Sequence, residues 1–149
     1  MSYAFDLTVK ALRNEGLSEK DIVEILESLS IELANMSVND KFLNGNIKNV
    51  LNQIYMPTHL AGYTYWIDAI RICKKNGKLK MMNLYKQVAE INRTTVTRVE
   101  RAMRFAKVSA FLACPLKITK EFLGKDVLSQ KDDFGIQNSE FLTILLEKV

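Results

Sequence analysis

The stretch from Thr94 to Ala110 constrains the fold of this chain more than any other, because its apolar residues recur with the period of an α-helix. The residues that form this apolar stripe are Val99, Ala102, Met103, Ala106 and Ala110. The opposite face carries Thr94, Thr97, Arg101 and Arg104, with Arg98 and Glu100 on its flanks. The pattern predicts an amphipathic helix that packs through small residues and presents arginines and one carboxylate outward.

A second, shorter helical pattern covers residues 84–91, directly before this stretch. Asn92 and the residue after it interrupt the pattern, and Thr94 or Thr95 is a suitable N-cap for the next helix. Ala89 is small enough to let two helices cross closely. Two short helices joined by a tight turn predict a helix-turn-helix motif, although Asn92 is polar where many such motifs have an apolar residue.

The outward face of the helix predicted over Thr94–Ala110 suits DNA binding. Arginine donates two hydrogen bonds to guanine O6 and N7, and glutamate accepts one from cytosine N4. An ordinary amphipathic surface helix would show similar residues, so the helix pattern before it and the distribution of charge decide between the two. Residues 1–42 hold four Lys/Arg and eight Asp/Glu, a net charge of −4, whereas residues 43–149 hold 17 and nine, a net charge of +8. Basic charge concentrated around a helix-turn-helix pattern favours a polyanion-binding protein.

Four lysines precede the motif and have two equally good interpretations. They contact DNA phosphates, which position a protein without specifying sequence, or they lie in a solvated loop. These lysines are Lys74, Lys75, Lys78 and Lys80.

The residues that enzymes and metal sites require are scarce. His59 is the only histidine, and Cys73 and Cys114 lack a Cys-x-x-Cys spacing. No glycine-rich phosphate loop or Gly-x-Ser-x-Gly pattern occurs. We therefore expect no enzymatic activity, cofactor, metal or small-molecule substrate. Neither a membrane-spanning apolar run nor a secretory signal is found, which predicts a cytoplasmic protein without membrane contact.

Helical periodicity covers most of the chain, and no strand pattern appears. Further helices are expected over 1–14, from Ser18 onward, over 47–54, 63–75 and 115–123, and from a cap at Ser139. Residues 125–136 are expected to form a loop, and the polar stretch Asn35–Asn46 a turn-rich boundary. The predicted fold is all-α: a helix-turn-helix-containing bundle over residues 43–149, preceded by an acidic helical hairpin over residues 1–42.

The expected hairpin has a glycine stop at Gly16 and a capping-box-like pair, Ser18 and Asp21. Its apolar stripe consists of Ile22, Ile25, Leu26, Leu29 and Leu33. Three roles remain open for residues 1–42. The hairpin assembles a homodimer, its acidic face masks the DNA site, or it packs on its own chain and only adds stability.

Three segments resemble a known family in their order and spacing. They are Met-Pro-Thr-His-Leu-Ala-Gly-Tyr-Thr-Tyr at 56–65, Thr-Thr-Val-Thr-Arg-Val-Glu-Arg-Ala-Met-Arg at 94–104 and Asn-Ser-Glu-Phe-Leu at 138–142. From about Leu43 to the last residue, the chain resembles the C-terminal DNA-binding (effector) domain of the master response regulator of endospore formation in Firmicutes.

The resemblance implies a six-helix, winged-helix-like transcription-factor domain that binds a short DNA box, often as tandem copies. Its recognition helix enters the major groove of double-stranded DNA. The positions that match are Thr97, Arg98, Glu100, Arg101 and Arg104. To these we add three expected DNA contacts: Thr94, Thr95 and Lys107.

Departures from the family concern one side chain, one link and one domain. Phe105 stands where the family usually has histidine, and the link between Gly77 and Leu84 is slightly shorter. Residues 1–42 are too short to be the family's phosphoacceptor receiver, so receiver phosphorylation is not the expected switch. The leading interpretation is a sequence-specific DNA-binding regulator. The alternative is a helical adaptor or antagonist that binds a protein partner of the sporulation pathway.

Overall fold

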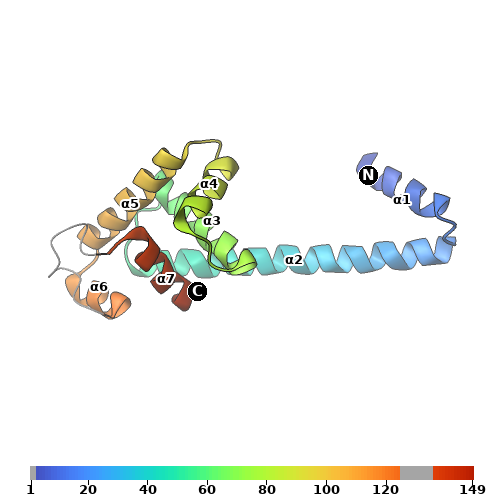
Figure 1. Cartoon of the computed structure of the whole chain (residues 1–149). Coiled ribbons are helices and arrows are strands. Elements are labelled where there is room, and N and C mark those ends of the chain that lie inside the picture. The colour runs from blue at the N-terminus through green and yellow to red at the C-terminus, as the bar shows by residue number, and fades with distance from the viewer. Residues whose placement is uncertain (1–2, 125–135) are drawn as a thin grey trace. The chain divides into compact units, whose positions relative to one another are not determined.

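The computed structural model describes residues 3–124 and 136–149, which contain seven helices and no strand (Figure 1). The helices are α1 (Tyr3–Asn14), α2 (Glu19–Gln53), α3 (Ala61–Asn76), α4 (Met81–Ile91), α5 (Val96–Ala113), α6 (Leu116–Leu123) and α7 (Asn138–Lys148). The prediction of an all-α fold is confirmed for these residues. Most of the loop expected over residues 125–136 lies outside the described part of the chain.

The chain divides into two compact units, Met1–Phe42 and Leu43–Val149. The division falls within Asn35–Asn46, but the turn expected there is wrong, because α2 runs without interruption through that stretch. Asparagine and serine lower helix propensity by only tenths of a kcal/mol each, and only Gly45 costs about 1 kcal/mol. With apolar helical periodicity on both sides and no proline between them, continuing the helix costs less than starting a new one.

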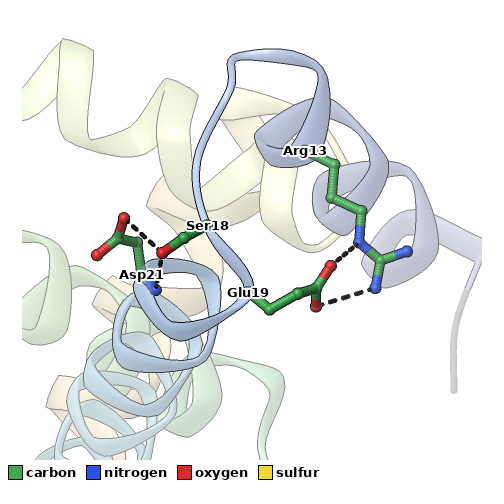
Figure 2. A network of polar contacts seen from close by, with 4 residues as sticks. All are labelled: Arg13, Ser18, Glu19 and Asp21. Atoms are coloured by element: carbon green, nitrogen blue, oxygen red, sulfur yellow. Dashed lines mark hydrogen bonds and ion pairs between the residues drawn. The ribbon is translucent and has the colours of Figure 1, made fainter.

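The first unit consists of α1 and the first part of α2, joined by a turn that is closed by side chains. Gly16 has φ 81°, which confirms it as the residue that ends α1. At the start of α2 the Ser18 hydroxyl donates to Asp21 Oδ2 (2.8 Å) and accepts from the Asp21 N–H (3.2 Å). Arg13 on α1 pairs with Glu19 on α2 through Nε (2.9 Å) and a second nitrogen (3.3 Å). Figure 2 shows these four side chains around the turn.

The core of the second unit is built around Trp66, which is fully buried on α3. Its indole N–H donates to the Met103 carbonyl of α5 (2.9 Å), and its ring meets Phe141 of α7 edge-to-face at 4.9 Å. Phe111 of α5 packs edge-to-face on the same Phe141 ring at 5.5 Å. The end of α2 contributes Ile47 and Leu51, and Ile54 directly after the helix joins them. Trp66 and Phe141 therefore hold α3, α5 and α7 together.

Gly62 allows α3 and α5 to approach each other very closely. A Cβ atom at this position would lie 2.1 Å from the carbonyl oxygen of Ala102 and 2.6 Å from the Cβ of Ala106. Both distances are far shorter than any van der Waals contact. The first turn of α3 thus rests directly on the backbone of α5, at the small residues that the sequence places there.

The ends of the later helices differ in one point from expectation. Gly124 follows α6, which ends at Leu123 as predicted, and adopts the left-handed conformation (φ 71°). Ser139 does not cap α7, because Gln137 occupies the N-cap position and the helix already begins at Asn138. The Ser139 carbonyl instead accepts a hydrogen bond from the Thr143 hydroxyl within the helix (3.1 Å). None of the described helices has the length and apolar character needed to cross a membrane.

Replacing Gly62 with alanine should lower the free energy of unfolding of the second unit by about 3 kcal/mol, because the new methyl group has to push α3 away from α5. Urea unfolding followed by the fluorescence of Trp66, the only tryptophan, measures this change.

Gly45→Ala is the matched control. Nothing lies within 4 Å of the Cβ that it adds on α2, so it should raise stability by about 0.5–1 kcal/mol. Equal stability of the Gly62→Ala protein and the wild type would show that α3 and α5 are not in contact at Gly62.

Candidate nucleic-acid interface

The turn between α4 and α5 is closed by backbone hydrogen bonds around Arg93. Arg93 has φ 51°, a left-handed conformation usually occupied by glycine or asparagine. The Thr94 N–H donates to the Ala89 carbonyl (2.9 Å), and the Arg93 N–H donates to the Glu90 carbonyl (3.3 Å). This is the Schellman arrangement, which satisfies the last carbonyls of α4 and reverses the chain within two residues. The sequence places the break correctly, and the structure gives its geometry.

The N-cap of α5 is Thr95, one of the two predicted candidates. Its side-chain oxygen accepts a hydrogen bond from the Arg98 N–H (3.2 Å). This bond satisfies one of the free N–H groups in the first turn of α5. Thr95 thus fixes where the helix begins, and with it the direction in which Arg98 leaves the backbone.

Asn92 occupies the position where many helix-turn-helix motifs have an apolar residue. Its side-chain amide donates to Asp68 Oδ2 on α3 (2.8 Å) and to the Val88 carbonyl (2.9 Å). Asp68 is 8% exposed, and Arg71 Nη1 lies 3.7 Å from its other oxygen. A hydrogen bond to α3 therefore replaces the apolar contact that usually holds this turn, and it ties the motif to the core.

The inner face of α5 matches the predicted apolar stripe. Val99, Met103, Ala106 and Ala110 are fully buried, and Ala102 is partly buried beneath Gly62. Packing on this face leaves the opposite side of the helix open to solvent.

The outer face brings together most of the predicted DNA contacts. The exposed members of the set are Thr95, Thr97, Arg98, Arg101 and Arg104, and the partly buried members are Thr94 and Glu100. Arg104 Nη1 lies 3.5 Å from Glu100 Oε1, one helical turn away, so the two side chains form an ion pair along one flank of α5. The result is a row of cationic, multidentate donors with one carboxylate beside it.

Lys107 does not belong to this face, and its prediction as a DNA contact is wrong. The side chain is only 1% exposed, and its ammonium group donates to the Ile136 carbonyl. On a helix with about 100° per residue, position 107 lies between Met103 and the outer arginines, where the segment that precedes α7 covers it. Charge and sequence proximity suggested an outward lysine, but burial assigns it a packing role.

The second half of the outer face is apolar, which the sequence analysis did not foresee. Phe105 is 61% exposed and Leu112, two turns further along α5, is 71% exposed. Leu116 at the start of α6 is 44% exposed. The seven-residue spacing from Phe105 to Leu112 was the signal that would have revealed it. The outer face of α5 is therefore divided into a polar half at its N-terminus and an apolar half at its C-terminus.

Two of the four lysines before α4 have a structural role. Lys74 donates to the Leu146 carbonyl (3.0 Å), and Lys78 donates to the Thr143 hydroxyl, so both link the end of α3 to α7. All four lysines are exposed, and Lys74 and Lys75 lie in α3, not in a loop. Contact of these lysines with DNA phosphates stays a prediction.

The α4–α5 pair is joined by a tight turn and packs on α3 and α7, with arginines on the exposed face of α5. These features define a helix-turn-helix DNA-binding domain. Comparison with known families identifies it further. The family model described as "Sporulation initiation factor Spo0A C terminal" matches residues 47–149, and the chain belongs to this family. The resemblance noted from the three sequence segments is thereby confirmed. The chain carries a DNA-binding effector domain of a sporulation transcription regulator, a class of transcription factor and not of enzyme.

Replacing Asn92 with alanine should lower the free energy of unfolding by about 1–3 kcal/mol, because buried Asp68 loses its amide donor. Urea unfolding monitored by Trp66 fluorescence gives the value. Asn83→Ala, an exposed asparagine on α4, is the control and should change stability by no more than about 0.5 kcal/mol. If the two variants are equally stable, the Asn92–Asp68 bond does not hold the turn.

Proposed function

We propose that this protein is a sequence-specific DNA-binding transcription regulator that places the N-terminal half of α5 in the major groove of a short DNA box. One observation carries the proposal: Thr97, Arg98, Arg101 and Arg104 share the exposed side of a helix whose other side is fixed in the core. In helix-turn-helix proteins the N-terminal residues of the second helix contact base edges. The divided outer face agrees with this, because donors and acceptors are confined to that half.

Each side chain has a role set by its chemistry. Arg101 and Arg104 are expected to donate pairs of hydrogen bonds to guanine, and Glu100 is expected to accept from cytosine. Thr97 and Arg98 lie nearest the start of the helix, where backbone phosphates are also within reach. The Glu100–Arg104 ion pair restricts Arg104 before DNA arrives, which lowers the entropy lost on binding.

Residues 1–42 themselves should not act as a phosphorylation switch of the receiver type. Residues 3–42 form α1 and part of α2, so this unit contains no sheet that could carry a phosphoacceptor site. We infer that the protein acts on DNA in the cytoplasm and that another property of the N-terminal unit modulates its binding.

Arg101→Ala should weaken binding to the selected box by about 1–3 kcal/mol and relax the preference at one base pair, because a bidentate contact is lost. Selection from random duplexes supplies the box, and affinities for that box and for scrambled DNA are then compared. Arg104→Ala should act similarly at a different position of the box.

Arg101→Lys tests whether the contact is to a base. Lysine keeps the charge but lacks the planar fork, so specificity should fall while affinity for scrambled DNA is retained. If Arg101→Ala weakens binding equally on both DNAs and Arg101→Lys changes neither, the residue contacts only phosphate and base reading by Arg101 is refuted.

Glu100→Ala should strengthen binding to scrambled DNA and reduce discrimination, because a carboxylate that repels phosphates also reads a base. Glu90→Ala removes the same charge from an exposed position of α4 and should leave discrimination unchanged. The measured quantity is the ratio of the two affinities at one fixed salt concentration. Identical ratios for the two variants would leave Glu100 with only its ion pair to Arg104.

A second candidate function is that of a helical adaptor or antagonist that binds a protein partner of the sporulation pathway. The exposed apolar side chains Phe105 and Leu112 on α5 favour it, since such a row is typical of protein contacts. The two functions differ in one observation. An adaptor yields no enriched sequence from random duplexes, whereas the proposed regulator yields a defined motif.

A further inference from the structure

The N-terminal unit has almost no core of its own. Among the side chains described over residues 6–42, Ile22 is the only buried hydrophobic one. Eight of the 14 large hydrophobic side chains that are exposed in the described chain lie in this short unit. They are Leu7, Val23, Ile25, Leu29, Ile31, Leu33, Val38 and Phe42. Units of about 40 residues or fewer usually need a crosslink, a metal or a partner to be stable.

An apolar stripe along the first half of α2 has the spacing of a coiled coil. It consists of Ile22, Leu26, Leu29 and Leu33 and is called the seam below. Apolar residues alternate at steps of four and three, which places Leu26 and Leu33 at a positions and Ile22 and Leu29 at d positions of a heptad. After a single polar break at Asp40, the same spacing continues through Leu43, Ile47, Val50 and Ile54. That second half is packed in the core of residues 43–149. The apolar stripe of α2 is therefore regular along the helix, but only its second half is packed in a core.

The hairpin partner α1 is too short to cover the first half. Its 12 residues span about 18 Å, whereas α2 from Glu19 to Phe42 spans about 36 Å. Figure 1 shows α1 folding back over the beginning of α2 only. Exposure along the seam rises accordingly with distance from the turn, from 2% at Ile22 to 44% at Leu29 and 65% at Leu33. The uncovered part is thus the part that α1 does not reach.

The charges of α2 permit a second copy of this acidic unit to occupy the seam. In the heptad register the acidic residues Asp21, Glu24 and Glu27 fall at the outer positions c, f and b. The positions that flank the seam, e and g, hold Val23, Ile25, Ser30 and Glu32, with a single charge among them. Two identical helices can therefore approach along this seam without opposing their acidic faces.

We propose that residues 1–42 form a homodimer in which the Leu26–Leu29–Leu33 seam of α2 packs against the same seam of a second copy. In a two-fold interface the same surface patch of both subunits forms the contact, so the patch must fit itself. A stripe with constant heptad spacing meets this condition. Two hairpins joined in this way make a four-helix arrangement with an apolar interior. The dimer carries two effector domains and so provides the assembly role among the three considered for this unit. It is independent of the proposed DNA binding.

The test is the mass of the full chain in solution, measured by light scattering over a range of concentrations. Wild-type protein should have twice the mass of one chain, and Leu29→Ser/Leu33→Ser should have half the wild-type mass. Ile31→Ser/Val38→Ser removes as many exposed apolar groups from the opposite side of α2, and it should remain dimeric. Monomeric wild-type protein, or loss of the dimer only in the Ile31/Val38 variant, would overturn the proposal.

Hydrogen exchange of the wild-type protein covers the case in which the serine variant unfolds the hairpin. Amides over residues 22–36 should lose protection on dilution, while those of α5 stay protected. Protection that is independent of concentration in a monomeric protein would mean that the seam packs within one chain, and the dimer would be refuted.

Binding to one and to two adjacent boxes separates this proposal from the function proposed above. The Leu29→Ser/Leu33→Ser variant should bind a single box like wild type and paired boxes about 10-fold or more less tightly, because the two binding events are no longer linked. Unchanged binding to paired boxes would contradict the assembly role. A dimer that selects no DNA sequence would refute the proposed function and leave the dimer standing.

Discussion

The contact between Gly62 and the backbone of α5 determines how the rest of the domain is arranged. No side chain separates the first turn of α3 from Ala102 and Ala106, so the two helices are in direct contact at this point. In this arrangement the Trp66 indole reaches the Met103 carbonyl in the middle of α5. The inner face of α5 is therefore fixed by backbone contact and a hydrogen bond as well as by apolar burial. The opposite face of α5 is therefore the one left exposed to solvent, and it carries the arginines.

The hydrogen bond between Asn92 and Asp68 also fixes the α4–α5 turn on α3. Asp68 lies on α3, only two residues beyond Trp66, so α3 holds α5 through one side chain and the α4–α5 turn through another. Hydrogen bonds fix direction more narrowly than apolar contacts do. A rigid support of this kind is what a reading helix needs, since small displacements of the arginines would misalign them with base edges.

Much of this arrangement could be predicted from the sequence, and the errors have physical causes. The α5 stripe, the break after Ile91 and the cap at Thr95 follow from local patterns, because period and capping chemistry act within a few residues. Lys107 was misplaced because its burial depends on a segment about 30 residues away, at Ile136. The turn expected at Asn35–Asn46 is absent because weak helix formers do not end a helix whose apolar periodicity continues on both sides. Asp68 was overlooked as a partner of Asn92, since no local pattern reports a contact between distant helices.

The division of the outer face of α5 sets a limit on how much information one domain can extract from DNA. From Thr97 to Arg104 the polar half extends about 10 Å along the helix axis. That length corresponds to about three steps between stacked bases at 3.4 Å each. DNA sequences of this length recur throughout any genome, which offers about 10⁶–10⁹ competing non-specific binding sites. Phe105 ends the row of hydrogen-bonding groups on α5. Recognition of a longer DNA sequence therefore requires a second DNA-binding domain and cannot come from deeper insertion of the same helix.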